Sequence, residues 1–446
     1  MRSLVADSGL TRSLRLPQAT ALVVGTIVGA SVFVQASEVT EHVPRIWAVL
    51  LAWTISGGLT MFGALACAEL ASAFPRTGGV YVFLRESYGP VAGFLWGWAM
   101  FWVMHSGIIA AMSMVFARYA GFFVPLGDRG SRAVAVATIL IISGLNYLGV
   151  KRSSTVQTTF TAGKLLAVVV IVIVGFVVGS RLPVHFQQGS GLAEARVLPQ
   201  NFLLALIAGL FAFGGWHVVT YTAEETVQPE RTIPRALVIG IVIVTVCYVA
   251  LNAVYFYVLP IDRVITSSRV AADVATALLG ASGGAAMSGL VMFSVFGAMT
   301  GSILAAPRVY FAMARDGLLF QWVNQVHPRF HTPHRAIVLQ AIWASALVWT
   351  GTYRQLFTRV IFTEWIFFAL MAAGIFLLRR RPGYAPTYRV WGYPWVPAVF
   401  IVASATIVVN RIVSEPLDSL AGLALVGLGV PAYYFWARRI VSVMKA

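Results

Sequence analysis

The chain has 446 residues, of which 59% are hydrophobic and only 11% are charged. Soluble domains carry about 25% charged residues, so this chain has too few charges to cover a surface in contact with water. The composition excludes a soluble protein and predicts an integral membrane protein.

Apolar stretches of about 20 residues, the length that crosses a bilayer, recur about twelve times along the chain. We expect spans near residues 18–41, 46–72, 90–123, 132–150, 155–179, 200–226, 235–259, 281–313, 335–352, 355–378, 394–412 and 418–437. The first is too long for a signal peptide and lacks a small-residue cleavage site. The loops are short, so the chain (1–446) is predicted to form one membrane domain.

Most of the 32 Lys and Arg residues fall on one side of the predicted membrane, the side that also holds both termini. The positive-inside rule places that side in the cytoplasm. The net charge of +16 therefore reflects topology and contact with anionic membrane lipids, and nucleic acid is not an expected partner. We predict a multi-pass protein of the inner (cytoplasmic) membrane with cytoplasmic termini.

Small residues interrupt two spans, the first at residues 25–31 and the sixth at Gly214 and Gly215. Paired interruptions in two halves of a chain are typical of the binding site of a secondary transporter. Close helix packing through small residues is the alternative, which two paired breaks make less favourable.

The breaks divide the chain into two five-helix repeats, about 16–180 and 199–380, followed by two helices at about 394–440. An odd number of helices per repeat inverts the second repeat in the membrane. The predicted fold class is an all-α membrane protein of 12 transmembrane helices. It has a 5+5 inverted repeat, discontinuous helices 1 and 6, and two extra C-terminal helices.

Six groups of short motifs follow one another in order, at residues 25–31, 68–81, 149–166, 211–225, 302–328 and 388–394. Together they resemble the L-type amino acid transporter branch of the amino acid–polyamine–organocation superfamily, along nearly the whole chain. The resemblance implies the LeuT-type fold and transport of amino acids, often by exchange.

The chain departs from that family's pattern at Ala30 and Ser31, which replace a serine and a glycine of the first-helix motif. It departs again at His217, where a residue such as asparagine is expected. Both changes bear on the substrate rather than on the fold. Family members that join a heavy glycoprotein subunit use a Cys in the loop between helices 3 and 4. Residues 127–130 contain none, so no disulfide-linked heavy subunit is expected.

An amino acid zwitterion needs partners for both of its charges inside the bilayer. Backbone amides that begin the outer half of helix 1 suit the carboxylate, helped by the helix dipole. Backbone carbonyls beside both breaks suit the ammonium. Phe211 is expected from the resemblance to be a gate over the substrate side chain. The predicted substrate-binding residues are Thr26, Ile27, Gly29, Ala30, Ser31, Phe211, Phe213, Gly214, Trp216 and His217.

Two charged residues fall deep inside predicted spans, Lys164 in the fifth and Glu364 in the tenth. A charge at that depth costs at least roughly 2.5–3.5 kcal/mol, so each needs a function or a partner. In sodium-coupled relatives of the fold a cation bridges helices 1 and 8, and the resemblance implies that Lys164 places its charge there. Proton coupling, a fixed charge that shapes exchange and a structural cap on helix 1 stay open for Lys164. Glu364 is either a proton carrier or cation partner, or a protonated packing acid.

Three acidic residues, Glu69, Glu224 and Glu225, are predicted near the cytoplasmic face. Two interpretations stay open, an inner gate and a solvated rim of salt bridges. The basic residues expected close to them are Arg76, Lys151 and Arg152, whereas Arg118 and Arg308 are expected to extend from span ends to the interface. His105 is expected to pack or to line the cavity.

The predicted function is exchange of small to medium neutral L-amino acids by alternating access. Proton-coupled amino acid symport is the alternative, and a transporter-like amino acid sensor is an alternative of another class. The sequence has no nucleophile–base set, metal motif or cofactor loop, so we expect no enzyme activity, no cofactor and no metal. The expected partners are amino acid substrates and membrane lipids.

Overall fold

The computed structural model describes residues 9–29, 31–179, 186, 197–267, 270–280, 282–351 and 353–436; the side chains of 31–34, 152, 284 and 353–360 are outside this description. Over these residues the chain is helical, and its only extended pairing is an isolated bridge between Leu14 and Thr226. The predicted all-α class is confirmed. Ala30 and the side chain of Ser31, two predicted substrate contacts, lie outside the described residues.

Up to the second break, the described residues of the first half of the chain form ten helical segments. They are α1 Leu16–Ile27, α2 Ser31–His42, α3 Ile46–Ala73, α4 Val80–Tyr88, α5 Pro90–Ala99, the π-helix η1 Met100–Met104, α6 His105–Ala120, α7 Asp128–Tyr147, α8 Val150–Gly179 and α9 Pro199–Ala212.

The remainder begins with a 3₁₀ helix and continues to the last described turn. Its segments are η2 Trp216–Glu225, α10 Pro229–Val258, α11 Ile261–Thr266, α12 Val270–Leu279, α13 Ser282–Ala305, α14 Pro307–Arg315, η3 Gln321–Val323, α15 His334–Thr350, α16 Tyr353–Leu378, α17 Trp395–Ser414 and α18 Pro416–Gly427.

Ten helical stretches among the described residues are long and apolar enough to cross a membrane. They are Ile46–Ala73, Pro90–Ala120, Asp128–Tyr147, Ser153–Gly179, Pro199–Glu225, Pro229–Val258, Ala285–Arg315, Ile361–Leu378, Trp395–Ser414 and Pro416–Trp436. The first predicted span consists of two short helices, α1 and α2, and the ninth is the 17-residue α15. The chain is a multi-pass membrane protein.

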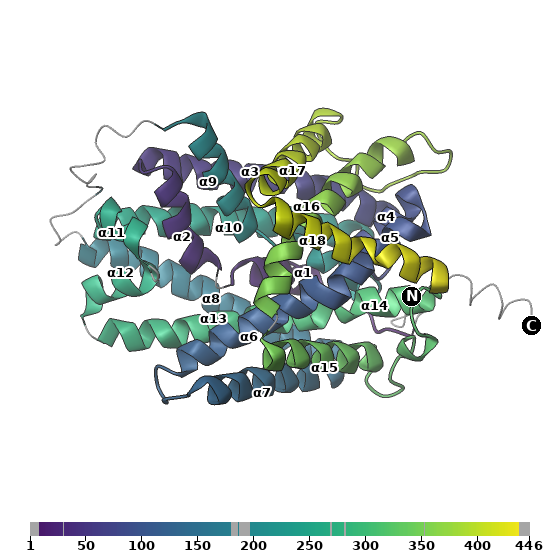
Figure 1. Ribbon diagram of the computed structural model, residues 1–446, viewed down its shortest axis with the longest axis horizontal. Coiled ribbons are helices and arrows are strands. Elements are labelled where there is room, and N and C mark those ends of the chain that lie inside the picture. The colour runs from purple at the N-terminus through teal and green to yellow at the C-terminus, as the bar shows by residue number, and fades with distance from the viewer. Residues whose placement is uncertain are drawn as a thin grey trace, which may run out of the picture.

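Helix α1 lies in the middle of the bundle, in contact with α8, α10, α13 and η2 (Figure 1). Short helices gather at the two ends of the long ones. At one end, on the left of Figure 1, α2 packs on α11 and α12, and at the other end lie α4 and α14. Outward faces are apolar; α8, for example, exposes Leu166, Ile173 and Val177. Such a surface suits lipid rather than water.

Candidate functional site

The two predicted helix breaks lie against each other in the centre of the bundle. The hydroxyl of Thr26, in the last turn of α1, is 3.1 Å from the carbonyl oxygen of Gly215 in the second break. Gly215 has a left-handed backbone (φ +99°), and a Cβ there would lie 3.2 Å from the Thr26 carbonyl oxygen. A glycine is therefore needed for both the turn and the close approach.

Replacing Gly215 with Ala should weaken this contact, because a left-handed conformation costs a residue with a Cβ roughly 1–2 kcal/mol. We expect a lower unfolding temperature and slower amino acid transport. Thermal unfolding and uptake by the purified protein measure both effects. The matched control is Gly144→Ala in α7, where a Cβ meets no atom within 4 Å; equal behaviour of the two variants would contradict the prediction.

Tyr248 of α10 joins the breaks from the other side. Its hydroxyl is 3.1 Å from the carbonyl oxygen of Ile27 and 3.1 Å from that of Ala212, so it reaches the last residue of α1 and the last residue of α9. Its ring packs against Trp53 and Phe213. Sequence reasoning missed this residue; the signal available was a phenol in the middle of an apolar span.

Tyr248→Phe should keep the ring packing and remove the link between the two breaks. Because one hydrogen bond contributes about 0.5–1.5 kcal/mol, we expect a modest loss of stability. Transport should fall by about tenfold if the two breaks move as a unit. Thermal unfolding and initial rates of exchange separate these effects, and unchanged exchange would contradict a role for the hydroxyl.

Lys164 of α8 reaches the first break with its ammonium. Its Nζ donates hydrogen bonds to the carbonyl oxygens of Gly25 (3.0 Å) and Val28 (2.8 Å), and the side chain is 2% exposed. Gly297 of α13 makes room for it, since a Cβ there would lie 2.9 Å from Lys164 Cε. The charge thus lies between α1 and α13, at the carbonyl end of the broken helix.

A cavity of about 480 Å³ opens beside the breaks. Its lining comes from helices of both halves of the chain and is Thr26, Ile27, Gly29, Gln35, His105, Ile108, Ala111, Met112, Val115, Leu210, Phe211, Gly214, Gly215, Trp216, His217, Val218, Ser302, Ala306, Ile361, Glu364, Trp365, Phe368 and Arg411. Its volume lies within the range of small-molecule sites, so it accommodates an amino acid.

Seven of the ten predicted substrate-binding residues line this cavity, namely Thr26, Ile27, Gly29, Phe211, Gly214, Trp216 and His217. Phe213 does not line the cavity, so its prediction as a substrate-binding residue is corrected. Its ring is fully buried against Trp53 and Tyr248. Phe211 borders the cavity with its ring edge-on to Trp365.

Three ionisable side chains from separate helices meet at the cavity wall. Glu364 of α16 and His217 of η2 lie 3.6 Å apart, measured from Oε1 to Nε2. His105 of α6 hydrogen bonds Tyr310 through Nδ1 (3.3 Å). We call His105, His217 and Glu364 the polar trio. The sequence-based expectations treated these residues separately, because they are far apart along the chain.

Ion pairs close the end of the bundle that carries α4 and α14, which we call the charged end. Glu225 accepts two hydrogen bonds from Arg308, from Nε and Nη2, each 2.9 Å long, and both side chains are fully buried. Arg308 was expected to extend toward the membrane interface, and that prediction is wrong. The carboxylate and a further bond to the Leu304 carbonyl hold its guanidinium inside.

Glu69 of α3 is the second buried acid of the charged end. It accepts two hydrogen bonds from Arg379 (2.9 and 2.6 Å), one from the Tyr384 hydroxyl and one from the Val390 amide. Burial, followed by the adjacent Glu69 carboxylate, raises the pKa of Tyr384 above its usual range, so its hydroxyl stays a donor. These contacts tie α3 to the segment after α16.

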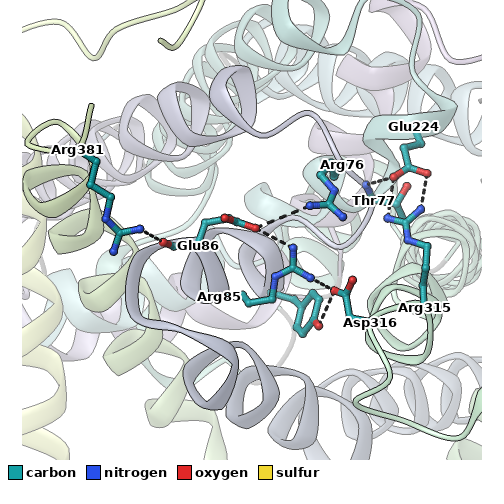
Figure 2. A network of polar contacts seen from close by, with 9 residues as sticks. Arg76, Thr77, Arg85, Glu86, Glu224, Arg315, Asp316 and Arg381 are labelled. Atoms are coloured by element: carbon teal, nitrogen blue, oxygen red, sulfur yellow. Dashed lines mark hydrogen bonds and ion pairs between the residues drawn. The ribbon is translucent and has the colours of Figure 1, made fainter. Parts of the chain in front are cut away.

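Glu224 belongs to a wider network (Figure 2). Arg315 binds both of its carboxylate oxygens, at 2.9 and 2.8 Å, and the Thr77 amide donates to it. Beside this pair, Arg85 contacts Asp316 and Glu86. The network connects η2, α4 and the end of α14.

Among the described side chains, the basic residues that pair with the three acids are Arg308, Arg315 and Arg379, none of which was an expected partner. Arg76 lies 3.8 Å from Glu86, Lys151 is exposed, and the side chain of Arg152 is outside the described residues. Full burial of Glu69 and Glu225 also corrects the interpretation as a solvated rim. Which arginine pairs with each glutamate depends on which helix ends lie close together in the fold. Separation along the sequence does not predict this.

The N-terminal segment adds to this closure. The amides of Ser13 and Leu14 donate to the Glu225 carbonyl, and the Leu14 carbonyl accepts from the Val227 amide. At the opposite side the cavity is lined by Gln35 of α2 and by Arg411, near the end of α17. The cavity thus extends from the breaks away from the charged end.

Comparison with known proteins shows the family to which this chain belongs. The family model described as amino acid permease matches residues 14–428. The chain belongs to the amino acid permease family. The predicted resemblance to amino acid transporters of this superfamily is confirmed.

Curated relatives of the permease are similar over nearly its whole length. The serine/threonine exchanger SteT of Bacillus subtilis (strain 168) is 32% identical over 442 residues, covering 98% of this chain and 99% of the relative. Asc-type amino acid transporter 1 of Mus musculus is 30% identical over 96% of this chain and 82% of the relative. The human cystine/glutamate transporter is 28% identical over 96% and 85%.

The permease is accordingly a multi-pass membrane transporter of amino acids and not an enzyme, as the family and the relatives are transporters. Its substrate cavity is expected in the middle of such a fold.

Proposed function

We propose that this permease exchanges small to medium neutral L-amino acids across the cytoplasmic membrane by alternating access. The observation that carries the proposal is that both helix breaks, joined by Thr26, Gly215 and Tyr248, end at one cavity of amino acid size. The likeness to a serine/threonine exchanger supports exchange over net uptake.

The fold proposed for this activity has twelve spans. Helices α1 and α2 together form the first span and α15 the ninth, added to the ten long ones. The first ten spans form two inverted repeats of five, about 16–180 and 199–380, as in the LeuT-type fold. The positive-inside rule supports placing the charged end and both termini in the cytoplasm of the inner membrane.

The substrate's two charges are proposed to lie at the breaks. The carboxylate meets the amide end of α2, at Gly29, Ala30 and Ser31, where the helix dipole is positive. The ammonium meets the carbonyl ends of α1 and α9, at Ile27 and Phe211. Phe211 closes over the side chain as a gate. Irregular backbone at this depth is tolerated only where it lines protein or a cavity.

The ion pairs of Glu69, Glu224 and Glu225 are proposed as the inner gate. Glu224 and Glu225 lie on η2, the continuation of the second break, whereas Arg308 and Arg315 lie on α14. Opening the cavity toward the cytoplasm requires η2 to move from α14, which breaks both pairs. With these pairs formed and the cavity extending the other way, the structure suits the outward-facing state of the cycle.

Lys164 is proposed as a fixed charge that takes the place of a bound cation between α1 and α13. A second function, proton-coupled symport, is favoured by one observation, the position of Glu364 at the cavity wall beside His217. A carboxylate there can meet a proton that arrives with the substrate.

We further propose that the permease works without a disulfide-linked heavy subunit. The sequence has two cysteines, and both lie in long helices, Cys67 in α3 and Cys247 in α10. Neither lies in the 127–130 loop, where family members that join a heavy subunit carry the linking Cys.

Uptake of radiolabelled amino acids into proteoliposomes tests the proposed function. Vesicles are empty or preloaded with unlabelled amino acid, with and without an inward proton gradient. Exchange predicts uptake only into preloaded vesicles, indifferent to the gradient. Uptake into empty vesicles that rises with the gradient would establish symport instead, and absence of uptake under every condition would refute transport of amino acids.

A further inference from the structure

The proposed contacts of the substrate's carboxylate and ammonium do not involve the polar trio. It lies on α6, η2 and α16, whereas those charges are assigned to the ends of α1, α2 and α9. Both ring nitrogens of His217 and Nε2 of His105 are buried and have no hydrogen-bond partner among the described residues. Buried polar atoms are rarely left unpaired, so a ligand group is expected to pair with them.

The surroundings of His217 direct it toward the cavity. The residue is 1% exposed, and its ring packs between Trp96, Tyr221 and Phe368. Beyond these rings, Glu364 Oε1 lies 3.6 Å from His217 Nε2. The Glu364 side chain is 12% exposed, and both residues line the cavity.

We propose that the polar trio is the subsite for the substrate's side chain, and that it selects neutral amino acids whose side chain carries a hydroxyl or an amide. This rests on the proposed transport function and names its substrate class. A hydroxyl or amide can donate to the carboxylate of Glu364 and accept from a ring N–H of His217 at the same time. An aliphatic side chain of equal size leaves those groups unpaired.

A cationic side chain matches the subsite less well. It can satisfy the carboxylate, but it has no acceptor for an imidazole N–H. The rest of the cavity wall around the trio is largely apolar, from Ile108, Met112 and Val115 of α6 to Trp365 and Phe368 of α16. A polar patch bordered by these apolar side chains fits a short side chain with a single polar group.

Two pairs of amino acids of nearly equal shape test this directly, threonine with valine and asparagine with leucine. Each competes against labelled serine for uptake by the purified full chain in proteoliposomes preloaded with serine. A site that hydrogen bonds a substrate group rejects the analogue without it far more strongly than an apolar pocket can. We expect threonine and asparagine to compete at least about tenfold better than valine and leucine.

Variants of Glu364 show whether the polar trio causes the preference for threonine over valine. Glu364→Leu should reduce the preference for threonine over valine to about threefold or less, and Glu364→Gln should retain most of it, since an amide still donates and accepts. Met112→Leu, an apolar change in the same wall, should alter both competitors by the same factor. If Glu364→Leu does not fold, the competition by threonine and by valine in the wild-type protein tests the proposal by itself.

Equal competition by valine and threonine in the wild type would overturn the subsite while leaving amino acid transport intact. Stronger competition by lysine or ornithine than by threonine would also overturn it, because the carboxylate would then be selecting a cation. Absence of uptake of every amino acid would refute the proposed function itself, and this inference with it.

Discussion

Lys164→Ala is expected to leave a folded protein whose amino acid exchange is about 10- to 100-fold slower. The ammonium makes two charge-assisted hydrogen bonds to carbonyls of the first break, each worth about 1.5–3 kcal/mol. Losing about 1.4 kcal/mol of that interaction in the rate-limiting step slows exchange about tenfold. Initial rates of exchange in proteoliposomes, measured in both directions, also report any change in asymmetry.

Two further variants separate charge from packing. Lys164→Met keeps most of the stem and removes the charge, so it should match Lys164→Ala in transport and exceed it in stability. Lys151→Ala, an exposed lysine on the same helix, should transport like the wild type. Wild-type exchange by the Ala or Met variant would disprove the role of the charge. Loss of transport only in proportion to loss of folded protein would assign Lys164 to structure alone.

Removing one member of the Glu225–Arg308 pair should have the largest effect on stability. Both side chains are fully buried, and an unpaired charge left behind costs about 3–5 kcal/mol. We expect Glu225→Ala or Arg308→Ala to lower the thermal unfolding temperature in detergent strongly and to reduce the yield of folded protein.

The double variant Glu225→Gln with Arg308→Met tests the cause. Because it leaves no unpaired charge, it should recover most of the stability, as replaced buried pairs often do. Asp128→Asn is the control for an exposed ion pair, since Asp128 is 77% exposed beside Arg132, and should cost at most about 1 kcal/mol. A double variant no more stable than the single ones would contradict the explanation. If the pair is also part of the inner gate, the double variant should show altered exchange despite its recovered stability.

The arrangement of helices was largely predictable because its signals are local. Ten of the twelve expected spans coincide with stretches of described residues that are long and apolar enough to cross a membrane, since a bilayer requires about 20 apolar residues in a row whatever surrounds them. The breaks were predictable for the same reason, because glycines at 214 and 215 interrupt a helix by their own conformational freedom. With 17 residues, α15 is shorter than any of those ten stretches.

Pairing across the bundle was not predictable in this way. Glu225 and Arg308 are 83 positions apart, and Glu69 and Arg379 are 310 apart. A charged side chain near a span end can extend to the interface or turn inward, and only the neighbouring helix decides. Tyr248 was missed on the same grounds, because its two carbonyl partners lie on α1 and α9.

The sequence by itself determined that the chain spans a membrane, where its two interrupted helices lie and which buried charges need an explanation, since hydropathy and glycine content act within one segment. Only the tertiary structure decided that the breaks touch, that Phe213 turns away from the cavity, that Lys164 binds the end of α1, and that His105, His217 and Glu364 meet at one wall. The physical reason is that a side chain's partner is set by the packing of helices that are distant in sequence, and hydrogen bonds and ion pairs act only over a few ångströms.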